Sequence, residues 1–213
     1  MVWRTIRMRS SNRIKEGMSF INQFANAIQQ VKLDKNFSDA AAAIIQCRLT
    51  YGKIVLCGMG KAGHIAEKSA STFCSLGFPA LFLHPGEASH GDIGIITDKD
   101  VLIVLSTSGK TREVIETINL SRKISVHRIV GITSHPDSEI RGLSDIIIDM
   151  GITKEASLKN GFNLAPTTST LIMLSILDAL ALVCASDQEF SFGEYALFHH
   201  SGYLGEMAKK KSK

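Results

Sequence analysis

Three glycines and one lysine have the spacing of an anion-binding turn. Gly58, Gly60 and Gly63 form the pattern G-x-G-x-x-G, and Lys61 follows the second glycine. Small residues let the backbone approach an anion, and the free N–H groups of a following helix favour negative charge. The same pattern occurs in dinucleotide-binding folds, where an acidic residue ends the second strand. Here the second expected strand ends at His84, which disfavours a nicotinamide dinucleotide.

A second turn carries hydroxyl groups at positions suited to a phosphate monoester. Ser106, Ser108 and Thr111 lie in the run STSGKT, immediately before an expected helix. Hydroxyls, exposed amides and a helix N-terminus together can surround three phosphate oxygens. A nucleotide P-loop would need glycine at the position of Val104, so that interpretation is rejected. The structural alternative is an ordinary serine and glycine turn that caps a helix.

The stretch after the second expected strand is rich in groups that could move protons or bind a metal. It contains His84, Glu87, His90 and Asp92. Two imidazoles and two carboxylates can transfer protons or bind a metal ion, but such residues also occur on ordinary surface loops. Glu113 follows the hydroxyl turn and is either catalytic or simply favourable at a helix start. Three histidines without a partner pattern are taken as structural: His64, His127 and His135.

Short apolar runs alternate with helical patterns through the middle of the chain. The expected strands cover 53–57, 80–84, 101–106, 128–133 and 145–149, and helices are expected over 63–76, 111–124 and 138–143. Continuous apolar runs are typical of strands covered on both faces, and the alternation indicates parallel βαβ crossovers. We therefore predict an α/β fold with a doubly wound, five-stranded parallel sheet. In such sheets ligands bind beyond the carboxyl ends of the strands, where the two turns lie.

Helices flank this region on both sides. Two amphipathic helices are expected before residue 51, the second starting near Ser38. An irregular stretch follows residue 149, and Pro166 with four hydroxyl residues then opens an apolar helix. The run 171–185 is shorter than a membrane span and contains Asp178, so we expect a buried helix and no membrane partner.

The net charge of +4 arises from the two ends of the chain, since all 20 acidic residues lie between them. We expect basic tails over residues 1–12 and 209–213 and a single domain over 13–208. No aromatic residues are interleaved with the basic groups, so we expect no nucleic-acid partner. The four cysteines show no metal-ligand spacing, and the first residues contain no apolar run of a signal peptide. These features favour a cytoplasmic protein with reduced thiols.

A set of motifs in a fixed order resembles one known family. In chain order they are GMGKAGH, FLHPGEASHGDIG, LSTSGKTRE, ITSHPDS, KEA, LAPTTST and HHSGYLG. Over residues 12 to 207 the chain resembles sugar isomerase (SIS) domains, and in particular the arabinose 5-phosphate isomerases. The resemblance implies that D-arabinose 5-phosphate and D-ribulose 5-phosphate are interconverted without an organic cofactor. By the same resemblance, the enzyme would supply the first precursor of the sugar acid Kdo for lipopolysaccharide or capsule synthesis.

The resemblance also assigns roles to individual positions. The catalytic groups that it implies are Lys61, Glu113, Glu155 and His199. The substrate contacts that it implies are Gly60, His90, Ser106, Ser108, Thr111 and Thr168, and no metal is expected. Members of the family build their sites at subunit contacts, usually in a tetramer, so we expect a homotetramer.

The chain departs from the family pattern in three ways. Family members commonly continue into two CBS domains, whereas the motifs here end with the SIS domain, so regulation through those modules is not expected. The connection KEASLKNGFNLAPT is longer than the usual one after Glu155. The closing motif contains two histidines, so His200 lies beside His199 and could compete for its role.

Aldose–ketose conversion needs a ring-opening acid or base, a base that moves one proton between adjacent carbons, and stabilisation of an enediolate. We expect Glu155 or His199 to move the carbon-bound proton and the other to open the ring or to shuttle protons between oxygens. Lys61 would stabilise oxyanion charge, and Glu113 would orient Lys61 or a hydroxyl group. Two alternatives remain: a non-catalytic sensor of a sugar phosphate or of CMP-Kdo, and a related phosphohexulose or phosphoheptose isomerase.

Overall fold

A computed structural model describes residues 10–212 apart from 125 and 127, so most of the expected N-terminal tail lies outside the described residues. Five parallel strands form one sheet in the order β2-β1-β3-β4-β5. Their bounds are β1 (Ile54–Gly58), β2 (Ala80–Leu83), β3 (Val101–Leu105), β4 (Arg128–Thr133) and β5 (Ile146–Asp149). Each expected strand is present, and the prediction of a doubly wound parallel sheet is confirmed.

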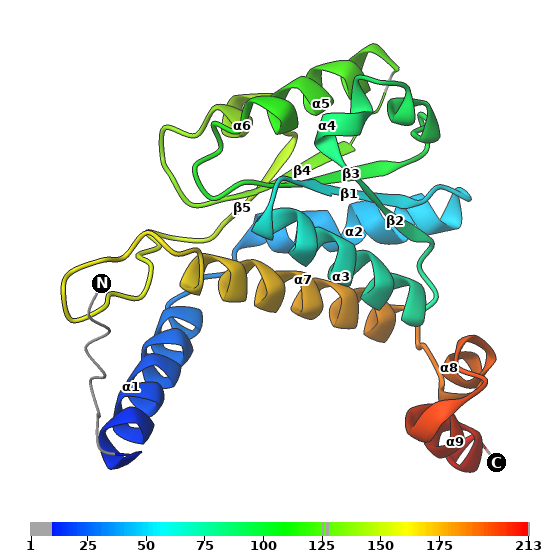
Figure 1. Cartoon of the computed structure of the whole chain (residues 1–213). Coiled ribbons are helices and arrows are strands. Elements are labelled where there is room, and N and C mark those ends of the chain that lie inside the picture. Colours follow the sequence, from blue (N-terminus) through cyan, green and yellow to red (C-terminus); the bar gives the residue numbers. More distant parts are fainter. Residues whose placement is uncertain (1–9, 125, 127, 213) are drawn as a thin grey trace.

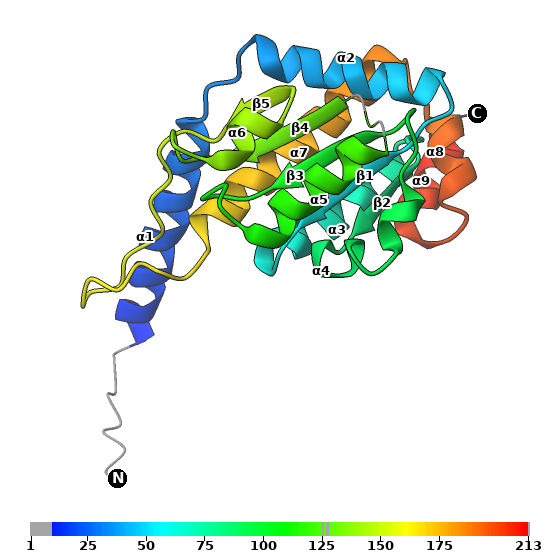
Figure 2. The same cartoon turned by 90° about the horizontal axis from the view of Figure 1, so that it is seen from above.

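Helices cover both faces of the sheet, as Figures 1 and 2 show. One face carries α4 (Pro85–Ala88), α5 (Arg112–Lys123) and α6 (Glu139–Leu143), and the other carries α2 (Lys35–Leu49), α3 (Lys61–Ser75) and α7 (Thr168–Asp187). Side chains alternate across the sheet, so Leu56 and Ile103 pack toward α7 whereas Val55 and Val104 pack toward α5. The two separate cores explain why the central strands read as continuous apolar runs.

Helix α7 lies along the sheet and is the most apolar helix of the described chain. By length and composition it could cross a membrane, with a mean hydropathy of 2.0. Its inner face is buried instead, through residues such as Met173 and Leu180, against α2 and α3. Lys68 of α3 forms an ion pair with Asp178 in the middle of α7, at 2.6 Å. The helix therefore packs as a core helix, as the sequence predicts.

The two N-terminal helices are packed unequally. Helix α1 (Ser10–Gln29) contacts α7 near its own end and otherwise points away from the sheet (Figure 1). Its apolar stripe is consequently uncovered, and Ile14 is 66% exposed. Helix α2 begins at Lys35, earlier than Ser38, because the Asp34 carboxylate accepts a hydrogen bond from the Asn36 N–H at 2.9 Å.

Two short helices that the sequence analysis did not predict follow α7. They are α8 (Phe192–Phe198) and α9 (Gly202–Lys211), which pack on each other beyond the C-terminal end of α7 (Figure 1). Ser191 and Glu194 form a reciprocal capping box, and the hydrogen bond from the Ser191 N–H lowers the pKa of the Glu194 carboxyl. Regular structure thus continues past the expected domain end at residue 208. Lys209 donates to the His200 carbonyl at 3.0 Å, and Lys211 lies over the Phe192 ring.

Candidate active site

The strand order places one crevice at the carboxyl edge of the sheet. The chain passes from β1 to β2 on one side and returns through β3 on the other, so β1 and β3 are neighbours whose following loops diverge. Such a switch point is the usual ligand site of an open α/β sheet. A cavity of about 320 Å³ lies there. Its walls come from the loops after β1, β3 and β4 and from the start of α7, and they include Met59, Lys61, Ser106, Ser108, Thr111, His135, Pro166, Ser169 and Thr170.

The loop after β1 forms the first wall. Gly60 has a φ of 61°, a conformation that favours glycine, and it immediately precedes the first residue of α3, Lys61. A Cβ at Gly63 would lie 2.6 Å from the Gly58 carbonyl oxygen, so glycine allows α3 to start close against β1. The exposed Lys61 side chain and the N-terminus of α3 then bring positive charge to the cavity.

The loop after β3 forms the second wall and is held by its own hydroxyl groups. Ser106 Oγ lies 2.9 Å from Thr111 Oγ1 and accepts a hydrogen bond from the Gly109 N–H at 3.0 Å. Ser108 Oγ accepts from the Lys110 N–H at 3.3 Å. The predicted grouping of these three hydroxyls around one turn is thus present. These hydroxyl groups are held by hydrogen bonds within the turn, and this order lowers the entropic cost of binding an anion.

The start of α7 forms the third wall, and Glu155 is bonded to it. One Glu155 carboxylate oxygen accepts hydrogen bonds from the Thr167 N–H at 2.8 Å and the Ser169 N–H at 3.3 Å. These N–H groups belong to the first turn of the helix and have no partner within it. Ser169 and Thr170 line the cavity, so Glu155 lies directly behind this wall.

The loop after β4 contributes His135, which sequence reasoning treated as structural. Its backbone N–H donates to the Thr107 carbonyl at 3.3 Å, and His135 is one of the residues that line the cavity. Its position two residues beyond the end of β4 was an available signal, because all carboxyl ends of a parallel sheet meet at one edge.

Gly60 and Glu155 adjoin the cavity without being among its lining residues, and four other sequence-predicted residues are not among them either. Glu113 is in the first turn of α5, and His90 is exposed between α4 and the short 3-10 helix Asp92–Ile95. Thr168 is buried and lines a different cavity of about 450 Å³, together with Thr153 and Ile172. The fourth is His199.

His199 follows α8, whereas the cavity adjoins the first turn of α7. Helix α7 has 20 residues and so separates the two by about 30 Å. The His199 ring stacks on Tyr195 with centroids 3.9 Å apart, and its Nδ1 lies 3.1 Å from the Tyr195 carbonyl oxygen. One copy of the chain therefore does not bring His199 to its own cavity.

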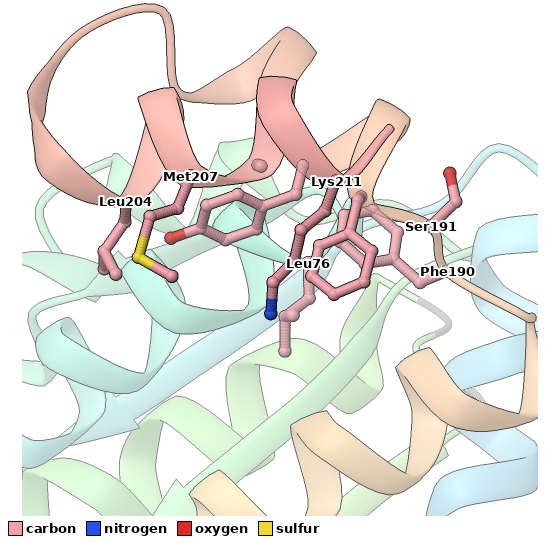
Figure 3. Close-up of a pocket in the computed structure, with 9 residues that line it drawn as sticks. Leu76, Phe190, Ser191, Leu204, Met207 and Lys211 are labelled. Carbon is pink, nitrogen blue, oxygen red and sulfur yellow. The ribbon is translucent and has the colours of Figure 1, made fainter. Parts of the chain in front are cut away.

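A second hollow near α8 and α9 has a different character (Figure 3). It measures about 490 Å³, and its walls include Leu76, Phe190, Leu204 and Met207, with Lys211 as the only cation among its described lining residues. Its apolar walls suit packing against another apolar surface. Ser191 and Tyr195 supply the hydroxyl groups among its described lining residues, and they do not form a turn of clustered hydroxyls like the one after β3.

The electrostatics of the crevice favour an anion. Among its described lining residues there is no carboxylate, whereas Lys61, His135 and the residues that carry the hydroxyl groups are all among them. The thiol of Cys57, one residue before the first turn, is buried, and this burial raises its pKa to about 12, so it is no nucleophile. Within the described part of the chain no three His, Cys, Asp or Glu side chains group as metal ligands.

Comparisons with known proteins point in the same direction. The SIS domain family model matches residues 50–183. The arabinose 5-phosphate isomerase KdsD of Francisella tularensis is 40% identical over 81% of this chain and 52% of its own length. The chain thus spans about half the length of the curated relatives that it matches.

Two solved structures are similar over almost their whole length. A candidate phosphosugar isomerase involved in capsule formation, from Bacteroides fragilis, is 36% identical with a TM-score of 0.84, over 90% of this chain and 99% of that one. An Escherichia coli CFT073 protein in complex with arabinose 5-phosphate is 30% identical with a TM-score of 0.83, over 90% of this chain and 100% of that one.

Proposed function

The chain belongs to the SIS domain family, and we propose that it is an aldose–ketose isomerase that interconverts D-arabinose 5-phosphate and D-ribulose 5-phosphate. The observation that carries this proposal is the crevice between β1 and β3, in which ordered hydroxyl groups and an exposed lysine face one small cavity. The KdsD relatives and the structure solved with arabinose 5-phosphate supply the choice of substrate. The reaction transfers a proton between adjacent carbons and needs no organic cofactor.

In this proposal the phosphate group binds to the turn after β3. Ser106 and Thr111 exchange their mutual hydrogen bond for bonds to phosphate oxygens, Ser108 adds its hydroxyl, and the N-terminus of α5 adds its partial positive charge. Gly60 lets the backbone approach the sugar. Phosphate binding then supplies remote binding energy that positions the reacting carbons beside Lys61.

The proton transfers are assigned to Glu155 and His199, with one moving the carbon-bound proton and the other opening the ring or shuttling protons between oxygens. Glu155 is supported by its place behind the first turn of α7, next to the lining residue Ser169. Lys61 stabilises the enediolate oxygen, and Glu113 orients Lys61 or a substrate hydroxyl. His90 and Thr168 are retained as proposed substrate contacts that require movement or a second copy of the chain.

His199 can take part only if another subunit provides it, and we therefore propose a homotetramer with sites at subunit contacts. The uncovered apolar residues on α1, α8 and α9 support extensive association, since Ile14, Phe198 and Leu204 are each more than half exposed. We place the enzyme in the cytoplasm, where its four free cysteines would stay reduced. We further propose that it serves Kdo synthesis for lipopolysaccharide or capsule.

The direct test is to incubate the purified protein with D-arabinose 5-phosphate and to follow D-ribulose 5-phosphate by proton NMR. Lys61→Met should lower turnover by roughly 100- to 1000-fold, as loss of one oxyanion-stabilising group does. Lys99→Met is the matched control, because Lys99 is exposed on the loop that enters β3, at the opposite edge of the sheet. Absence of ribulose 5-phosphate with the wild-type protein, or equal rates for the two variants, would contradict the proposal.

A further inference from the structure

His135 occupies a rigid position on the wall of the cavity. Its backbone N–H donates to the Thr107 carbonyl of the hydroxyl turn at 3.3 Å. Its carbonyl accepts hydrogen bonds from the Ser138 N–H at 3.2 Å and from Arg141 Nε at 2.8 Å. The following residue is Pro136, which further restricts the loop. The imidazole is therefore attached to the same framework as the hydroxyl turn.

The charges around His135 leave its imidazole available to an anion in the cavity. Asp137 is the neighbouring carboxylate, and Lys110 Nζ donates to it at 2.6 Å, which lowers the pKa of Asp137 and compensates its charge. Arg141 is engaged with Asp149 at 2.6 Å. Lys61 is the one lysine or arginine among the described residues that line the cavity, and it comes from a different strand end.

We propose that His135 is a phosphate-positioning residue whose imidazolium form donates a hydrogen bond to the bound phosphoryl group. Imidazole changes its charge between about pH 5 and pH 8, and a nearby dianion favours the charged form. Binding of the dianion then brings a proton onto His135. We expect the affinity to be highest at low pH, where an imidazole is already charged, and to fall toward about pH 8, where it is neutral.

This inference rests on the proposed function only for the identity of the sugar. Its core is a statement about dianion binding, so it can be tested without turnover. Inorganic sulfate is a suitable probe because it remains a dianion throughout this pH range, whereas phosphate esters titrate within it. A tenfold loss of sulfate affinity between low and high pH corresponds to about 1.4 kcal/mol of difference in interaction between the two charge states of the site.

Sulfate binding is measured by calorimetry between about pH 5 and pH 8 for the wild-type protein, His135→Asn and His135→Lys. The wild-type dissociation constant should rise about tenfold more over this range than that of His135→Asn. His135→Lys should bind tightly at both ends, because its charge is permanent. Parallel profiles for wild type and His135→Asn, absence of sulfate binding, or a His135→Lys variant as weak as His135→Asn would each overturn the proposal.

Kinetics provide an independent readout if the protein is an isomerase. His135→Asn should raise KM for the sugar phosphate about tenfold at low pH and leave kcat within about twofold, because the residue positions the phosphate and touches no reacting carbon. A variant that lost kcat with KM unchanged would contradict the positioning role. A protein inactive on arabinose 5-phosphate but with the predicted sulfate profile would refute the substrate assignment alone.

Discussion

Replacement of Glu155 should reveal two effects that can be measured separately. Its carboxylate accepts hydrogen bonds from the Thr167 and Ser169 N–H groups, so it caps the N-terminus of α7 as well as serving as a proposed proton-transfer group. Loss of a capping acceptor costs about 0.5–2 kcal/mol, and loss of a negative charge beside a helix N-terminus costs about 0.3–1 kcal/mol. One carboxylate supplies both contributions, so Glu155→Ala should lower the free energy of unfolding by about 1–2 kcal/mol.

The corresponding fall in Tm is roughly 2–8 °C for a chain of this size, measured at one fixed protein concentration because assembly also affects Tm. Activity should fall far more, by about 100- to 10,000-fold, if Glu155 acts as a general acid or base. Glu155→Gln keeps an oxygen that accepts the same hydrogen bonds. It should therefore retain most of the stability while losing activity to a similar extent.

Asp34→Ala is the matched control. Asp34 caps α2 by the same kind of hydrogen bond, at the start of a helix whose residues do not line the crevice. We expect a comparable loss of stability with unchanged turnover. An unfolding free energy of Glu155→Ala within a few tenths of a kcal/mol of wild type would refute the capping argument. Full activity of Glu155→Gln would refute the catalytic assignment.

Three other predictions follow from the described contacts. Gly109 has a φ of 64°, and a Cβ there would overlap the side chain of Ser138. Gly109→Ala should therefore lower the free energy of unfolding in urea by at least about 1–2 kcal/mol and raise KM. Wild-type values of both quantities would contradict this. The buried Asp100 accepts a hydrogen bond from the Lys53 backbone N–H at 2.8 Å and pairs with the Lys53 ammonium at 2.6 Å. Asp100→Ala should therefore lower the free energy of unfolding by about 2–3 kcal/mol. A shift of the urea midpoint smaller than that of Asp34→Ala would contradict this. A thiol reagent at neutral pH should label the exposed Cys74 in the native protein and all four cysteines after denaturation. Burial raises the thiol pKa of Cys47, and it raises the thiol pKa of Cys57 and Cys184 to about 12. Rapid labelling of any of these three buried cysteines in the native protein would refute the packing.

The sequence alone determined the local structure and the anion-binding turns. Continuous apolar runs predicted all five strands, because side chains on both faces of β1, β3 and β4 are buried and must be apolar, while those of the edge strands β2 and β5 are mostly half-buried. The glycines before α3 and the hydroxyls after β3 were recognisable because each acts through neighbouring backbone atoms. The two C-terminal helices were missed, since they are short and leave Leu197 and Tyr203 exposed, which weakens the apolar periodicity.

Only the tertiary structure decided which of these pieces meet. The strand order puts the turns of Lys61 and Ser106 at one switch point and brings His135 beside them from the next strand. In the folded chain Glu155 is hydrogen-bonded to the start of α7, whereas His199 lies beyond the other end of that helix. Local patterns could not reveal this, because the order of strands depends on how both faces of the sheet are covered. That coverage is a property of the whole packed chain, whereas hydrophobic periodicity reports only on near neighbours.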